Sequence, residues 1–214
     1  LGVDATKQIP YKYVYLHGLV RDKDRQKMAK SKGNVIDPLG VIDIYGADAL
    51  RMALIVGNTP GSDPIIYEEK IRGYRNFANK VWNASRFVFM NLADFKPDPK
   101  PRLALADKKI LLNLKKLSKQ ITEDMDSFKF YRAAEKLYHY FWHTFADKII
   151  EQQKSRLQGG DRQDKRASQY LLLEILQTNL KLLHPFMPFI TEEIYQKLPL
   201  KQKKKCLMIE DWPA

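Results

Sequence analysis

The sequence predicts a mainly α-helical protein, in which an antiparallel helical bundle follows a small mixed α/β region. Beyond residue 64, apolar residues recur at every third or fourth position through most of the chain. Short breaker segments separate these stretches, so neighbouring helices are expected to run antiparallel. The first 64 residues instead carry a strand-like apolar run and charged turns. We therefore divide the chain into residues 1–64 and 65–214.

The first region contains several short elements. Tyr13–Val20 is rich in aromatic and β-branched residues and predicts a buried strand, yet the residues before it offer no second strand of similar strength. We therefore expect the chain to begin partway into a domain. A charged turn then leads to the segment Lys27–Asn34. A short helix is predicted over Val41–Val56, and the cluster Asn58–Pro64 ends it and marks the boundary.

The second region predicts five helices. The longest covers about residues 68–92, and the three prolines within Lys96–Pro101 predict a stiff linker after it. Asp107 is placed to cap the next helix. The remaining helices share an apolar stripe at helical spacing and cover about residues 107–125, 130–149, 170–183 and 188–198.

Composition narrows the possible functions. The formal net charge of +12 favours a polyanionic partner, either nucleic acid or an acidic membrane surface. The single cysteine excludes an intramolecular disulfide. His139 and His143 lie four residues apart, but no third ligand accompanies them, so no metal site is expected. Without a membrane-spanning apolar run or a signal peptide, the chain is expected to be cytoplasmic.

Lys27–Asn34, here called the lysine loop, has the composition of a phosphate-binding segment. It places two lysines three residues apart ahead of Ser-Lys-Gly-Asn. Such charge is most useful where negative charge develops, as on a departing pyrophosphate, and a glycine lets the loop change conformation. Alternatively, the lysines form an ordinary solvated charge run. The candidate contacts to phosphate are Lys27, Lys30, Ser31, Gly33 and Asn34.

The helix predicted over residues 68–92 carries a polar face of arginine and asparagine. No Asp or Glu occurs between Lys70 and Ala93, whereas a merely solvated helix usually mixes both signs. Such a face suits phosphates and the edges of unpaired bases, and Phe87 is placed to stack on one. Alternatively, the asparagines join helices, and Trp82 is expected in the core. The face consists of Arg72, Arg75, Asn76, Asn79, Asn83 and Arg86.

Several segments resemble one family in the same order along the chain. The lysine loop resembles the KMSKS loop of class I aminoacyl-tRNA synthetases, with Ala29 in place of the usual serine, and Gly46–Arg51 resembles the helix that follows it. The loss of that hydroxyl leaves both lysines in place. Three further segments are similar to successive parts of the anticodon-binding bundle in the valyl members: Tyr74–Phe87, Leu183–Tyr195 and Met208–Pro213.

This resemblance implies a class I anticodon-binding domain over residues 65–214, preceded by the end of a Rossmann-type catalytic domain. It implies an ATP-dependent ligase that joins valine to tRNA, with Mg and no metal held by this part. Lys27, Lys30 and Ser31 would be catalytic during valyl-adenylate formation. The contacts to ATP would be Lys27, Lys30, Gly33 and Asn34.

The resemblance also implies the partners. The bundle would bind a valine-accepting tRNA, whereas ATP and valine would bind only in the full-length enzyme. Because the HIGH motif and the editing domain would lie upstream, we expect this chain to bind tRNA without aminoacylating it, as a monomer away from membranes. The alternatives are the same region of an isoleucyl or leucyl enzyme, or a non-enzymatic basic RNA-binding bundle.

Overall fold

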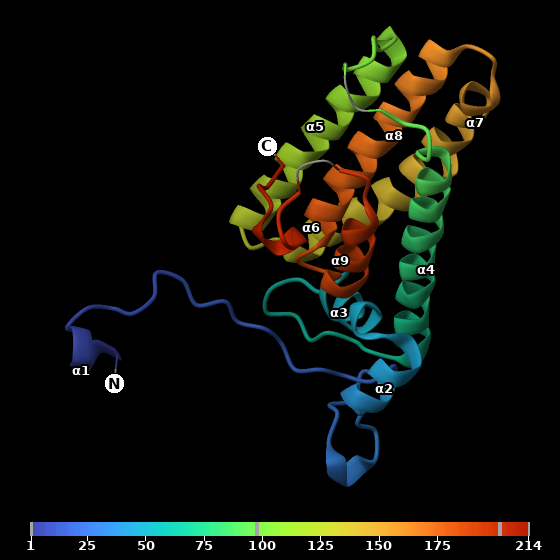
Figure 1. Cartoon of the computed structure of the whole chain (residues 1–214). Coiled ribbons are helices and arrows are strands. Elements are labelled where there is room, and N and C mark those ends of the chain that lie inside the picture. Colours follow the sequence, from blue (N-terminus) through green and yellow to red (C-terminus); the bar gives the residue numbers. More distant parts are fainter. Residues whose placement is uncertain (1, 97–98, 201–202, 214) are drawn as a thin grey trace.

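The computed structural model describes residues 2–96, 99–200 and 203–213. Within these ranges the regular secondary structure is helical, with isolated bridges at Arg21 but no strand (Figure 1). The bundle is formed by α4 (Glu68–Asn91), α5 (Leu105–Asp126), α6 (Phe130–His139), η2 (Tyr140–Ile149), α7 (Ile150–Gln158), α8 (Arg162–Leu183) and α9 (Pro188–Lys197). The shorter helices are α1 (Gly2–Thr6), η1 (Lys30–Lys32), α2 (Pro38–Tyr45), α3 (Ala47–Ile55) and η3 (Leu207–Ile209).

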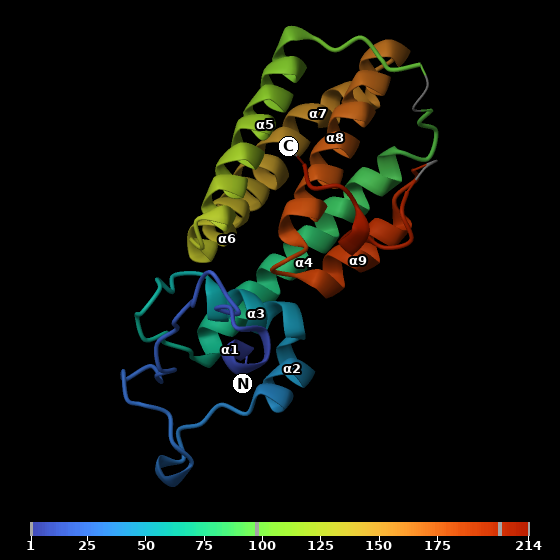
Figure 2. The same cartoon turned by 90° about the vertical axis from the view of Figure 1, so that its left-hand side faces the viewer.

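The predicted helical bundle is confirmed. Helix α8 contacts α4, α5, α6 and α7, and both views show α5, α7 and α8 side by side (Figure 2). Its core is aromatic and aliphatic because the apolar stripes of these helices face one another. Fully buried members include Phe77, Phe141, Phe145, Leu176 and Tyr195. None of the helices in the described ranges is both long and apolar enough to cross a membrane.

The third predicted helix is longer and less regular than expected. It continues from α6 through η2 to the end of α7 at Gln158. The middle segment, η2, is π-helical, with hydrogen bonds between residues five apart instead of four. Helix α8 also begins earlier than predicted, at Arg162. The Asp161 side chain caps it by accepting hydrogen bonds from the backbone N–H groups of Gln163 and Asp164.

The single helix predicted over Val41–Val56 is wrong. The chain instead forms α2 and α3, which are separated at Gly46. Gly46 has a φ of 86°, which glycine adopts at far lower cost than other residues. Helix α2 starts three residues earlier than predicted because Asp37 caps it, accepting hydrogen bonds from the N–H groups of Leu39 and Gly40.

The buried strand predicted over Tyr13–Val20 is also wrong for this structure. The segment is irregular and exposed, with relative accessibilities of 71% at both Val14 and Leu16. Within the described residues no strand lies beside it to satisfy its backbone. Tyr13 and Tyr15 contact the Phe128 ring at the α5–α6 turn, with ring centroids 5.2 and 6.2 Å apart.

A second, smaller core attaches the lysine loop to the bundle. Ala49, Ala53, Ile66 and Ile71 are buried in it, and Tyr74 of α4 packs against both cores. Helix α3 is also tied to the α8–α9 turn. The Asp48 carboxylate accepts hydrogen bonds from the N–H groups of Phe189 and Ile190, and the Arg51 guanidinium donates to the carbonyls of Pro185 and Phe186.

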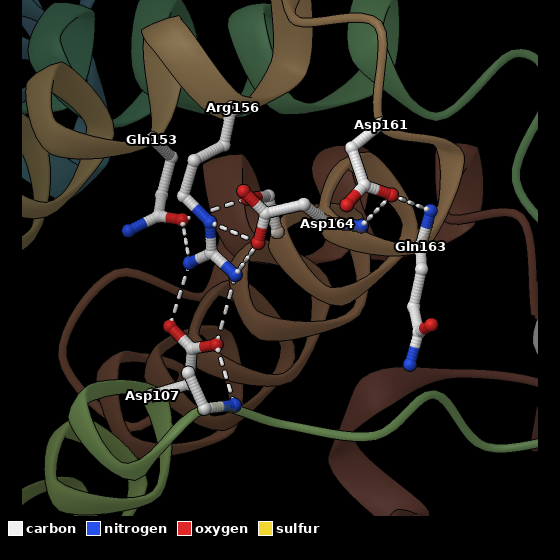
Figure 3. A network of polar contacts seen from close by, with 8 residues as sticks. Asp107, Gln153, Arg156, Asp161, Gln163 and Asp164 are labelled. Atoms are coloured by element: carbon white, nitrogen blue, oxygen red, sulfur yellow. Dashed lines mark hydrogen bonds and ion pairs between the residues drawn. The ribbon is translucent and has the colours of Figure 1, made fainter.

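A buried ion-pair network joins α5, α7 and α8 at the other end of the bundle (Figure 3). Arg156 contacts both oxygens of Asp107, at 2.7 and 3.0 Å, and also the carboxylate of Asp164. Asp107 is 1% exposed. The predicted capping role of Asp107 is a minor one, because its side chain accepts a 3.3 Å hydrogen bond from the Ala104 N–H while Arg156 is its main partner.

The linker predicted over Lys96–Pro101 is irregular where it is described. Residues 97 and 98 lie outside the described residues. Lys96 and residues 99–104 connect α4 to α5 without a helix. Figure 2 shows this connection crossing over the beginning of α8.

Candidate functional site

The lysine loop is closed by the side chain of Asn34. Its Oδ1 accepts a 2.9 Å hydrogen bond from the Ala29 N–H. Its Nδ2 donates to Asp22 Oδ2 at 2.7 Å and to the Lys27 carbonyl at 3.3 Å. Asn34 therefore uses both halves of its amide to hold the two ends of the loop together.

Asp22 organises the turn before the lysine loop, and sequence reasoning did not identify it. Its Oδ1 accepts hydrogen bonds from the N–H groups of Asp24 and Gln26, at 3.0 and 2.8 Å. The hydrogen bond from Asn34 lowers the pKa of Asp22, so this carboxylate stays ionised at neutral pH. The available signal was its place in a short polar turn, where an aspartate often accepts from the N–H two residues later.

The loop directs its lysines into solvent. Met28, between them, packs against the smaller core. Lys30 begins the 3₁₀ turn η1, which ends at Gly33 with a φ of 66°. Lys27, Lys30 and Ser31 are exposed, and their side chains form no hydrogen bond or ion pair with any other residue that the structure describes. Two uncompensated ammonium groups thus stand on a loop with an anchored centre.

The predicted polar face of α4, here called the α4 basic face, lies on the surface. All six residues are exposed: Arg72, Arg75, Asn76, Asn79, Asn83 and Arg86. The opposite face, with Phe77, Val81 and Val88, is fully buried. Neither Asn79 nor Asn83 makes a side-chain hydrogen bond to another described residue, so the helix-joining alternative finds no support in this part of the chain.

Two aromatic residues of α4 lie at the edges of this face. Phe87 is half-buried against the main core, and the Lys154 ammonium lies 5.9 Å from its ring centre. Trp82 is also half-buried against the core, as the non-functional interpretation predicted. The Phe87 ring is therefore less accessible to a base than the sequence pattern suggested.

A second aromatic group lies beside α4 on the π-helical segment η2. Trp142 stacks on Phe77, with ring centroids 6.2 Å apart and an interplanar angle of 15°. Lys80 of α4 places its ammonium 5.6 Å from the Trp142 ring and pairs with Asp147 at 2.6 Å. Neither Lys80 nor Trp142 was predicted to lie at this surface, because their proximity depends on how α4 packs against η2.

Two family models match the chain. Residues 107–214 match the anticodon-binding domain of tRNA ligase. Residues 1–66 match the class I tRNA synthetases specific for I, L, M and V. The lysine loop lies within the second match, and α4 lies between the two.

Curated relatives match along the whole chain. It is 46% identical to the valine–tRNA ligases of Carboxydothermus hydrogenoformans and Geobacter sulfurreducens, with all of the chain aligned in each case. It is 48% identical to that of Syntrophotalea carbinolica over 97% of the chain. The chain spans about a quarter of the length of these relatives, 24% in each comparison.

Solved structures share the fold at lower identity. A leucyl-tRNA synthetase from Agrobacterium radiobacter K84, in a ternary complex with tRNA and LeuAMS, superposes with a TM-score of 0.72 at 23% identity. The match covers 92% of this chain and 23% of that one. A Mycobacterium tuberculosis methionyl-tRNA synthetase bound to methionyl-adenylate gives 0.71 at 24% identity, covering 84% and 36%.

Proposed function

Because the chain belongs to the class I tRNA ligases and carries their anticodon-binding domain, we propose that it binds the anticodon arm of a valine-accepting tRNA. The α4 basic face is the contact surface in this proposal. We place the boundary between the two parts at residues 64 and 65. The part before it carries the lysine loop, and the part after it binds RNA.

The acid-free α4 basic face carries the proposal. Its three arginines and three asparagines are exposed, and the sequence has no acidic residue between Lys70 and Ala93. Arginine contacts phosphate with two parallel N–H groups, and an asparagine amide can both donate to and accept from the edge of an unpaired base. The face thus offers both charge and base-reading groups.

The lysine loop supports a second part of the proposal, which applies to a protein of the relatives' length. There, Lys27 and Lys30 contact the phosphates of ATP and stabilise the charge that develops on pyrophosphate as valyl-adenylate forms. Ser31 adds a hydroxyl, Gly33 permits the loop to move, and Mg accompanies ATP. Asn34 acts mainly by fixing the loop, since its amide is already bonded within it.

Lys30→Ala tests this role in a protein of that length. We expect ATP–pyrophosphate exchange to slow by at least about a hundredfold, in line with the loss of one preorganised electrostatic contact to a transition state. Lys23→Ala, which removes an exposed lysine from the neighbouring turn, is the matched control. An unchanged exchange rate in Lys30→Ala would remove the catalytic assignment.

The RNA-binding function is tested on the 214-residue chain itself. Hairpins with the anticodon arms of valine, isoleucine and leucine tRNAs are titrated at one fixed salt concentration, each with its own anticodon and with a swapped one. A preference that follows the valine anticodon is expected. A preference for another anticodon would assign the chain to the isoleucyl or leucyl members.

Equal affinity for every hairpin, with a steep salt dependence, would favour the remaining alternative, a basic bundle that binds RNA without reading it. Arg75→Gln with Asn79→Ala on the α4 basic face is expected to reduce the anticodon preference. We further propose that the protein acts in the cytoplasm as a monomer. Gel filtration with light scattering tests the oligomeric state.

A further inference from the structure

A basic pocket lies beyond the C-terminal end of α4, away from the α4 basic face and the lysine loop. It has a volume of about 530 Å³ and lies between the α4–α5 linker and the first turns of α8. We call it the distal basic pocket. Its charged lining consists of six cations and one carboxylate: Lys96, Lys100, Arg102, Arg162, Lys165, Arg166 and Asp94.

Contacts from α8 hold the linker in place and give the pocket its shape. The Arg166 guanidinium donates to the carbonyls of Lys96 and Pro99. Gln169, which is 3% exposed, donates to the Asn91 carbonyl at 2.6 Å and to Asp94 at 2.7 Å. The walls are therefore built by specific hydrogen bonds between α8 and the chain that leaves α4.

Three of the six cations have no polar partner among the described residues. The side chains of Lys96, Arg102 and Arg162 are exposed and make no hydrogen bond or ion pair with any residue that the structure describes. By contrast, Lys165 pairs with the only carboxylate of the lining, Asp94, at 2.6 Å. The pocket therefore keeps an excess of positive charge that the protein does not neutralise.

Three of the lining cations lie near the N-terminus of α8, where positive charge does not stabilise a helix. Arg162, Lys165 and Arg166 lie in the first two turns of α8, where the helix dipole favours negative charge. The one acid of the first turn, Asp164, pairs instead with Arg156, which does not line the pocket. Asp161 caps this helix end with its own carboxylate, so the excess positive charge comes from the linker and α8 cations together, and a bound anion would balance it.

We propose that the distal basic pocket binds backbone phosphates of the RNA that the α4 basic face holds. This inference rests on the proposed function and deepens it by adding a second contact region at the far end of α4. The pocket supplies charge and arginine N–H donors but few groups for base edges, so it adds affinity without sequence preference. Helix α4 connects the two surfaces, and its Asn91 carbonyl is itself bonded to the pocket wall.

The test replaces the three unpaired cations at once. The pocket variant is Lys96→Gln, Arg102→Gln and Arg162→Gln. The matched control is Lys115→Gln, Lys116→Gln and Lys119→Gln on α5, where the three side chains are likewise exposed and without a partner among the described residues. Both variants lose three positive charges, so they share the same net charge.

Affinity for the valine anticodon hairpin is measured over a range of salt concentrations. Each single-stranded phosphate contact contributes about 0.7 to the slope of log affinity against log salt, so the pocket variant is expected to lose about 2 from that slope. The control is expected to stay close to the unaltered chain. Arg162→Gln alone is expected to give about a third of the loss. The pocket variant, which removes clustered like charges, is expected to melt no lower than the control.

The possible results separate the two proposals. A slope loss confined to the pocket variant, with the anticodon preference intact, supports both. Equal slopes for pocket and control variants overturn the pocket while leaving the anticodon proposal in place. A slope loss without any anticodon preference supports the pocket and overturns anticodon reading. Absence of hairpin binding by the unaltered chain overturns both.

Discussion

Replacing Arg156 by methionine is expected to destabilise the bundle strongly. The substitution leaves the Asp107 carboxylate 1% exposed and without its two contacts to the guanidinium, at 2.7 and 3.0 Å. Among the described residues, only the Ala104 N–H, at 3.3 Å, would remain as its partner. The nearby carboxylate also raises the pKa of Arg156, so the guanidinium carries its charge throughout the accessible pH range.

The size of the effect follows from this burial. Removing one partner of a buried pair costs about 3–5 kcal/mol, because the other charge is left uncompensated. The Arg156 side chain is 19% exposed, which admits some water, so we expect about 3 kcal/mol. With a urea dependence of about 2 kcal/mol per molar, the unfolding midpoint would fall by about 1.5 M.

Urea unfolding followed by far-ultraviolet circular dichroism measures this shift. The control is Lys154→Met, two residues earlier on α7, which breaks an exposed pair with Glu151 and is expected to cost less than about 1 kcal/mol. Combining Arg156→Met with Asp107→Leu removes both charges and is expected to recover most of the lost stability. If Arg156→Met shifted the urea midpoint no further than Lys154→Met, the network would contribute no more to the free energy of unfolding than an exposed ion pair.

Three further predictions follow from single contacts. Asn34→Ala is expected to speed hydrogen exchange at the Ala29 amide at least several-fold, because that amide loses its acceptor; unchanged protection would contradict the closing role. Asp48→Ala is expected to lower the free energy of unfolding by about 1–2 kcal/mol, because α9 loses its cap. Asp48→Asn is expected to cost less, because burial already raises the pKa of this carboxyl and an amide keeps an acceptor. Equal thermal melting of the two variants would count against capping. The Tyr195 hydroxyl lowers the pKa of Glu210 to about 2 from 4.5, so its stabilisation is present above pH 4.5 and disappears as the pH falls towards 2. Glu210→Gln is expected to flatten this part of the curve of melting temperature against pH, and an unaltered acid slope would refute it.

The helical part of the fold was predictable because its information is local. Phe141, Phe145 and Ile149 recur every four residues and all three are buried. The same periodicity places the arginines and asparagines of α4 opposite Phe77 and Val81. Where a helix buries one face on its neighbours, the sequence shows directly which residues remain outside.

The incorrect predictions involve longer-range or backbone information. Tyr13–Val20 has the composition of a strand, but a strand forms only beside another strand, and none lies next to it in the described residues. The break at Gly46 depends on a positive φ that no apolar pattern reveals.

Part of the candidate site could not be predicted from the sequence, because it too depends on long-range contacts. The Asn34 side chain donates a hydrogen bond to Asp22, twelve residues earlier, and Asp48 accepts one from the N–H of Ile190, 142 residues later. Neither pairing has a periodic signature, because each depends on where folded elements meet. The sequence therefore indicated which groups carry charge, whereas the structure shows which of them hold the loop and the helices in position.

Helix α4 fixes a distance as well as a surface. Its 24 residues form a rod of about 36 Å, which is anchored at one end by Ile71 and Tyr74 in the smaller core and at the other by Asn91 beside the distal basic pocket. A rigid rod with anchored ends acts as a ruler, so a ligand that touches both ends must match its length. Under the proposed binding mode, the length of the bound RNA would therefore matter in addition to its charge and sequence.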